Sequence, residues 1–226
     1  MTQRSIQAGA NQTIIIKVGG SVTVKGHDSQ LLTAETASKW GMSVEQRSAA
    51  QIGRARAVVG EHVLFDLRLK RPDQKDEEII VVQMGASGEV LVPFSSNLKV
   101  YAGRDIDVRA VQGQVDAYAG LNLVMREVYG LGNASAGRSM DIDCQTLLGT
   151  DVTIQAGRDL RFHILDLSSL RLKVKDIGGY WEAIIGGGEK TVYLKSGGDV
   201  TFVTDQKVEA QPPNYILGRI EKPRAA

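Results

Sequence analysis

The sequence predicts an all-β fold: a single-stranded β-solenoid (β-helix) of about ten short rungs with non-solenoid tails. Three observations predict it. A glycine-centred motif recurs at a nearly fixed period, apolar residues alternate on both sides of each glycine, and small or turn-forming residues adjoin it. The clearest pair of motifs is VYAGRDIDV at 100–108 and IQAGRDLRF at 154–162. A fixed period in strand-like segments indicates a stack of similar coils.

The glycines that centre the rungs follow one another at similar intervals. From Gly85 onward the successive spacings are 18, 17, 17, 20, 21 and 19 residues. The best rungs centre on Gly19, Gly103, Gly120, Gly137, Gly157 and Gly197, with poorer ones near Gly41, Gly60, Gly85 and Gly178. Glycine fits a tight corner because it has no side chain, and the Ser, Asp or Asn two residues later can bond nearby backbone amides.

Apolar side chains stand three and five residues before and after most of these glycines. Positions two apart in a strand face the same way, so each rung is predicted to hold two short strands with one inward face each. Equivalent residues, among them Ile106, Leu123, Met140 and Leu160, should then form one row in a dry interior. A second bend in the rung is expected at 112–113, 129–130 and 148–149, where glycine recurs.

Three segments fit the repeat poorly. Residues 43–57 begin with a capping-box pattern, Ser43 followed by Gln46, so a helix stays open there although strands are favoured. The rung around Gly178 breaks the inward column and is predicted to be irregular. The charged run at 70–78 is expected to be a solvated loop.

Composition suits one compact domain. The chain has 226 residues, 42% hydrophobic and 23% charged, and we divide it into a tail at 1–12, the solenoid at 13–205 and a tail at 206–226. A net charge of +1 argues against a nucleic-acid surface. No signal peptide or membrane span is apparent, and Cys144 is the one cysteine, so a cytoplasmic location is expected.

Two glycine-rich stretches resemble nucleotide-binding motifs. IIIKVGGS at 14–21 resembles the opening of the amino-acid kinase family, which implies a small-molecule kinase whose Lys17 and Gly19-Gly20 meet phosphates. In that family a helix follows, whereas here Val22 and Val24 continue an alternating strand. IIGGGEKT at 184–191 resembles a phosphate loop, but Glu189 stands where glycine is required. Glycine corners between strands explain both stretches better.

Charged columns suggest a second group of alternatives. Arg104, Arg138 and Arg158 occupy equivalent positions, which leaves a carbohydrate-binding surface open. Four carboxylates lie in the neighbouring columns, as in β-helices that cleave polysaccharides, namely Asp105, Asp159, Asp107 and Asp141. Turn formation and exposed strand faces account for them without catalysis. His27, His62 and His163 lack the spacing of a metal site, and we assign no catalytic, cofactor or metal-binding residues.

The stretch VPFSSNLKVYAGRDIDV at 92–108 and the rungs that follow resemble the bacterial putative-adhesin β-solenoid domains, as does IKVGGSVTVKG at 16–26. The Ala-Gly-Arg-Asp corners also resemble the repeats of filamentous haemagglutinins. The rung length resembles that of bactofilins, cytoskeletal solenoids that polymerise end to end. The resemblance covers most of the chain, and it implies a bacterial structural protein rather than an enzyme.

The ends of a solenoid bear on its function, because they expose unpaired strand edges that must be capped or joined to another copy. The segment at 211–224 carries four apolar residues that could dock on an end rung or on a neighbour: Tyr215, Ile216, Leu217 and Ile220. We therefore expect a non-enzymatic scaffold that associates with itself, as an oligomer or a filament, through terminal rungs or tails. No cofactor is expected.

Overall fold

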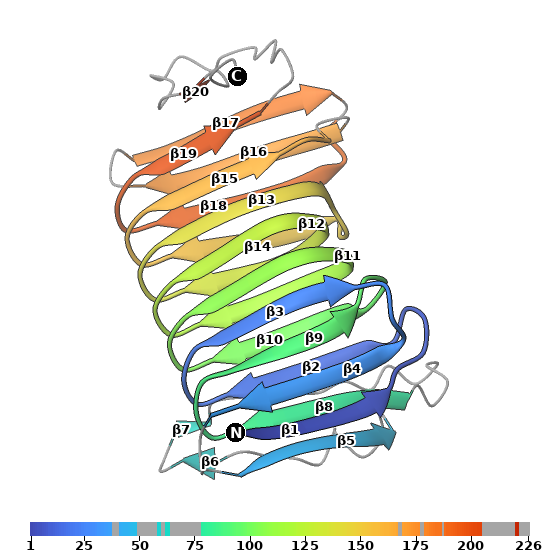
Figure 1. The fold of residues 1–226 in the computed structure, drawn as a ribbon. Coiled ribbons are helices and arrows are strands. Elements are labelled where there is room, and N and C mark those ends of the chain that lie inside the picture. The colour runs from blue at the N-terminus through green and yellow to red at the C-terminus, as the bar shows by residue number, and fades with distance from the viewer. Residues whose placement is uncertain are drawn as a thin grey trace.

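The computed structural model describes residues 1–37, 41–48, 58–59, 62–63, 78–166, 169–176, 179–186, 188–204 and 220–221. None of these residues forms a helix, and the strands make an elongated stack (Figure 1). All but two strands belong to one large mixed sheet of 18 strands, and β6 and β7 pair separately. The predicted all-β class is confirmed for the described residues.

The strands are β1 Thr2–Gln7, β2 Thr13–Val18, β3 Val22–His27, β4 Leu31–Thr36, β5 Met42–Ser48, β6 Val58–Val59, β7 His62–Val63, β8 Glu78–Met84, β9 Gly88–Pro93, β10 Asn97–Ala102, β11 Ile106–Ala119, β12 Leu123–Ala136, β13 Met140–Leu147, β14 Asp151–Ala156, β15 Leu160–Ile164, β16 Ser169–Asp176, β17 Gly179–Gly186, β18 Lys190–Ser196, β19 Val200–Val203 and β20 Ile220–Glu221.

Strand pairing divides the large sheet into two walls. The first wall runs β5, β8, β2, β10, β11, β12, β14, β18, β16, β17. The second runs β1, β4, β9, β3, β11, β12, β13, β15, β19, β20. The long strands β11 and β12 bend and contribute to both walls. Pairing is parallel except near the ends.

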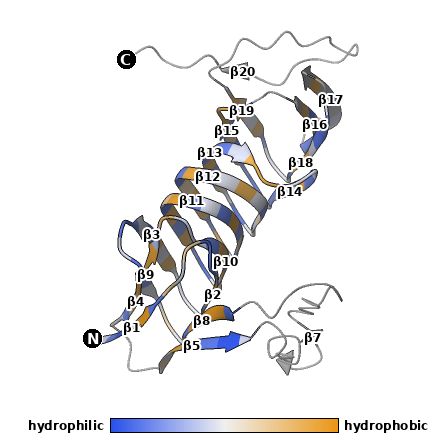
Figure 2. Cartoon of the chain, turned by 90° about the vertical axis from the view of Figure 1, so that its right-hand side faces the viewer, coloured by the Kyte–Doolittle hydropathy of each residue, from blue (hydrophilic) through white to orange (hydrophobic). Residues whose placement is uncertain are grey.

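The inward side chains of both walls form one hydrophobic core along the stack. Ile106 pairs with Leu123, Leu123 with Met140, and Met140 with Leu160, and all four are buried. The predicted interior row is therefore present. Hydrophobic colour alternates along the strands in Figure 2, as expected when one face of each wall packs inward. A smaller cluster, Ile15 with Ile79 and Val81, lies on the opposite face of β2 and β8.

Glycines stack directly on one another at the first corner. In the order Gly85, Gly19, Gly103, Gly120, Gly137, Gly157, Gly197, each amide from Gly19 onward donates to the carbonyl of the residue before the previous glycine. A Cβ on any of them except Gly85 would overlap the carbonyl oxygen of its stacked neighbour. The corner thus requires glycine for close backbone approach rather than for its conformation.

The second corner differs from the sequence prediction. Residues 112–113 and 129–130 lie inside β11 and β12, and the left-handed backbone falls upstream, at Ala110 (φ 55°) and Glu127 (φ 56°). Each residue turns its strand from one wall to the other. Sequence inspection favoured the glycines because alanine and glutamate rarely adopt positive φ. Residues 148–149 do form a bend.

The spatial order of the strand pairs departs from chain order near both ends. β2 and β3 lie between the pair β8–β9 and the pair β10–β11, although they precede both in the chain (Figure 1). Near the other end β18 lies between β14 and β16. The sequence suggested rungs stacked in chain order, which holds only for the middle of the molecule.

The irregular segments are resolved in part. Met42–Ser48 is strand β5, antiparallel to β8, so strand rather than helix is correct there, while 49–57 lie outside the described residues. Gly60, Gly178 and residues 70–77 also lie outside them. The segment 1–12, assigned to a tail, contains β1, and the segment 206–226 contains β20, which pairs with β19.

Candidate functional surfaces

The backbone of the glycine pair at 19–20 is engaged in the strand stack and is not open to a nucleotide phosphate. Lys17 points away from the core on the outer side of β2, and the glycine pair leads into strand β3. Gly19 packs against the backbone of Gly85, and Gly20 against Ser87. A phosphate loop needs backbone amides open to the ligand, whereas the Gly19 amide donates to the carbonyl of Met84 at 2.9 Å.

A hollow of about 770 Å³ opens on the outer side of the first wall beside Lys17. Tyr101 and Tyr118 line it, with their rings stacked 5.1 Å apart and 9° from parallel. Burial, together with the neighbouring Tyr118 and Asp116, raises the pKa of Tyr101 to about 12. Burial and the charge of Arg47 lower the pKa of Lys17. The phenol of Tyr101 therefore stays protonated at neutral pH.

The second glycine-rich stretch, at 184–191, is also engaged in contacts within the protein. Gly188 has a φ of 68°, a turn conformation, and Lys190 donates from Nζ to the carbonyl of Leu147 at 3.1 Å. The lysine that a phosphate loop would aim at its ligand thus ties β18 to the end of β13.

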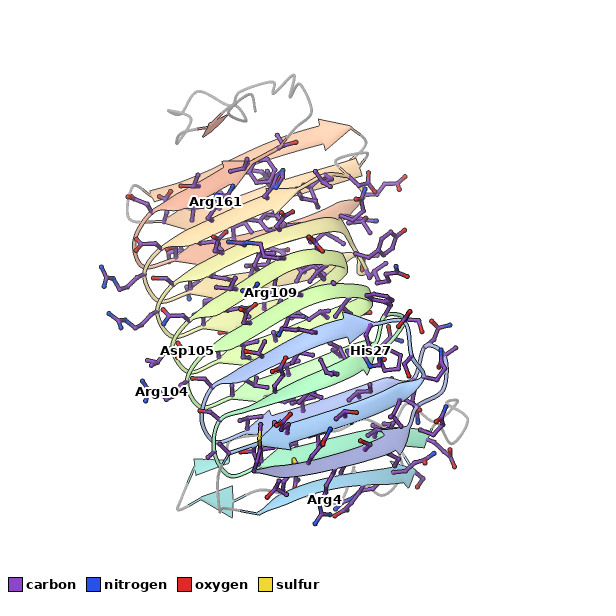
Figure 3. The ribbon with its side chains drawn as sticks, in the orientation of Figure 1. Arg4, His27, Arg104, Asp105, Arg109 and Arg161 are labelled. Carbon is purple, nitrogen blue, oxygen red and sulfur yellow. The ribbon has the colours of Figure 1, made fainter. Side chains whose placement is uncertain are left out.

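The arginine column lies at the first corner. Arg104, Arg138 and Arg158 follow their glycines, and their side chains are exposed. Figure 3 shows Arg104 and Asp105 at the edge of the ribbon opposite His27. Leu121 interrupts the column between Arg104 and Arg138, since the amide of Arg138 bonds to the carbonyl of Leu121. The three guanidinium groups remain available to solvent but do not form a continuous groove.

Two of the four carboxylates of the neighbouring columns, Asp105 and Asp141, are bound by nearby side chains. Asp105 accepts hydrogen bonds from Asn122 and Ser21, of which the Asn122 side chain contributes most to lowering its pKa. Asp141 is bound by Arg126 and by Arg161. Burial raises the pKa of Asp141, but these two guanidinium groups outweigh it and leave the pKa lowered. Both carboxylates are thus held ionised as structural acceptors, unlike the raised pKa of a general acid.

The remaining candidate residues are the histidines, the cysteine and the self-association residues of the C-terminal segment. His27 contacts the carbonyl of Leu31 through Nε2, and His163 lies 3.3 Å from Asp143. In the part of the chain that the structure describes, no three metal-ligating side chains come together. Burial raises the pKa of Cys144, which keeps the thiol protonated. The self-association residues Tyr215, Ile216 and Leu217 lie outside the described residues, and Ile220 lies in β20.

Sequence inspection missed a cationic surface near the C-terminal end. Four cationic side chains point outward from β16 and β18 on one side of the first wall: Arg171, Lys173, Lys175 and Lys195. On the same side, β17 adds the acidic side chain of Glu182. We call these five residues the basic face. Its formal charge is +3, against +1 for the whole chain. The signal was hidden because strands β16 and β18 are neighbours in space but not in sequence.

Partners within the basic face leave two of its amines free. Arg171 lies 3.4 Å from Glu182, and the Lys173 ammonium sits 5.4 Å above the centre of the Tyr193 ring. Lys175 and Lys195 are register partners on adjacent strands, and both are exposed. Neither has a hydrogen-bond or ion-pair partner among the described residues. Like charges directly opposite each other destabilise a sheet, so this pair does not support the fold.

The described residues include no helix long and apolar enough to cross a membrane.

No protein-family model matches the sequence, and no curated protein matches it. Among solved structures, the chain is similar to a putative cell adhesion protein from Clostridium sporogenes ATCC 15579, with a TM-score of 0.41 and 10% identity over 90% of this chain and 99% of that one.

Proposed function

We propose that this chain is a non-enzymatic structural protein: a β-solenoid that joins to further copies of itself through strands at its ends. The observation that carries the proposal is the contrast between a continuous core and an exposed edge. The core runs from β8 to β19 through parallel strands, which suits a rod. A rod of this kind exposes unpaired strand edges only at its two ends.

The C-terminal end supplies the more suitable edge. Among the described residues β17 pairs only with β16, so one edge of its backbone is open to a further strand. Two large apolar side chains of this strand are exposed, Tyr180 at 60% and Ile184 at 47%. Edge strands that avoid association usually carry lysine or proline, and β17 has neither.

The opposite end is less suited to association. Its edge strands β1 and β5 are exposed or half-buried and mostly polar, with Arg4 on β1 and an ion pair between Glu45 and Arg47 on β5. Figure 3 shows Arg4 at that end. We therefore propose that copies meet at their C-terminal ends. An interface of identical edges closes as a two-fold dimer.

Light scattering coupled to size exclusion, over a range of concentrations, tests this proposal. Ile184→Lys places a charge on the β17 edge and should convert an associated species to monomer. Ile6→Lys makes the same change on β1 and should leave association intact. Removal of residues 207–226 tests the tail that carries Tyr215, Ile216 and Leu217. A wild-type protein that is monomeric at every concentration contradicts the proposal.

A further inference from the structure

We propose that the basic face docks on the anionic surface of a lipid bilayer. The inference begins with the uncompensated amines: Lys175 and Lys195 stand side by side on β16 and β18 without a carboxylate partner in the described part of the chain. Such a pair repels within the isolated protein. An external anion between the two ammonium groups would relieve that repulsion.

The side chains around these amines favour a membrane over a soluble anion. Seven large apolar side chains are exposed in the described residues, and three of them, Tyr180, Ile184 and Tyr193, lie on the same side of these strands as the basic face. Tyrosine has an apolar ring with a polar tip, which suits the boundary between headgroups and acyl chains. Lysine stems can likewise lie along apolar surface while the ammonium reaches the headgroups.

The shape and position of the face agree with this partner. Outer faces of neighbouring strands present a broad surface instead of a slot, so several headgroups can contact it at once. Arg171 balances the charge of Glu182, and Lys173, which lies over the Tyr193 ring, adds one more cation next to the free pair. Lysine and arginine residues close to an anionic leaflet are each attracted to it.

Vesicle co-sedimentation tests the proposal, with phosphatidylcholine vesicles that do or do not contain phosphatidylserine. Wild-type protein should bind only the vesicles that contain phosphatidylserine, and the amount bound should fall at high salt. Lys175→Glu combined with Lys195→Glu should weaken binding at least about thirtyfold, since two attractive charges are lost and two repulsive ones are gained. The arginine version of the same pair should retain binding.

A matched control makes the same charge change elsewhere. Arg104→Glu combined with Arg138→Glu alters two exposed cations at the glycine corner, and binding should change by less than about threefold because screening limits distant charges. Melting curves of all variants establish that each is folded. Equal binding by wild type and the Lys175/Lys195 variant overturns the proposal. So does binding to inorganic polyphosphate without binding to vesicles, which would indicate a soluble polyanion instead.

The membrane proposal stands independently of self-association. Lys175→Glu combined with Lys195→Glu should lose vesicle binding and keep association, because the two lysines lie on β16 and β18 and not on the edge strand β17. Loss of association together with loss of vesicle binding in this folded variant contradicts the assignment of docking to a surface separate from the association edge.

Discussion

The middle of the molecule and its two ends are built from the same strands but are connected differently. From β10 to β15, each strand pair stacks on the pair that precedes it in the chain. Near the ends, β2 and β18 are inserted between strands that come from elsewhere in the sequence. The difference teaches that the order of strands along the chain and their order in the sheet agree in the middle of this protein and disagree near its ends.

In a simple repeat array the first repeat contacts one neighbour and frays easily. Here the first parallel strand, β2, has hydrogen-bonded neighbours on both edges, β8 and β10. The strands that occupy the N-terminal end are instead antiparallel: β1, β4 and β5. Stability should therefore follow position in the sheet rather than position in the sequence.

The largest expected effect tests that rule at β2. Ile16 is fully buried, and Ile16→Ala should lower the free energy of unfolding by about 3 to 4 kcal/mol, as for a central core residue. Ile6 is half-buried on the otherwise exposed edge strand β1, and Ile6→Ala should cost about 1 kcal/mol. Chemical denaturation measures both. Hydrogen exchange adds a second test, since amides of β2 should exchange as slowly as those of β10. Fast amide exchange in β2 would contradict the rule that stability follows position in the sheet.

A smaller loss of stability is expected at the glycine corner. It is tested by comparing a glycine of the central stack, Gly137, with a glycine near the N-terminal end, Gly41. The Cβ of Gly137→Ala would overlap the carbonyl oxygen of Gly120, and neither backbone can move without disturbing the stack. We expect a loss of about 2 to 3 kcal/mol. Gly41 has open space around its Cα, so Gly41→Ala should change stability by less than about 0.5 kcal/mol. Equal losses in thermal melts would argue against stacking as the reason for glycine.

The smallest effect concerns the second corner, which is defined best in the middle of the chain. Glu127 is exposed and has a φ of 56°, so Glu127→Gly should stabilise the protein by about 1 kcal/mol through relief of backbone strain. Gln155→Gly, at an exposed position in β14, should instead destabilise it by a similar amount. A destabilised Glu127→Gly variant would show that the side chain outweighs the backbone at this corner.

The sequence was sufficient for the repeat and insufficient for the order of its parts. Alternation around Gly103, Gly120 and Gly137 predicted the interior row, because inward residues must be apolar whichever strand lies next to them. Because an apolar inward face accepts any apolar neighbour, the same pattern does not predict the order of strands near the ends. The inward faces of β8 and β10 fit β2 as well as each other, so the pattern of side chains does not specify which pair of strands is adjacent.

Functional surfaces were harder to predict than the core. The cations of the basic face lie on β16 and β18, which pair in the sheet although β17 and its turns separate them in the chain. Net charge gave no hint, since acidic residues elsewhere balance these cations. The arginine column at the corner, by contrast, followed directly from the period, because its members occupy the same position in each repeat.

The inserted position of β2 also has a consequence for synthesis on the ribosome. Ile14 finds its partners in Ile80 and Leu98, which emerge 66 and 84 residues later. Until then both edges of this hydrophobic strand are without their final neighbours, and early chains are open to aggregation. The nascent protein therefore depends on delayed closure at its N-terminal end, and a chaperone that shields residues 13–18 during translation should raise the yield of native protein.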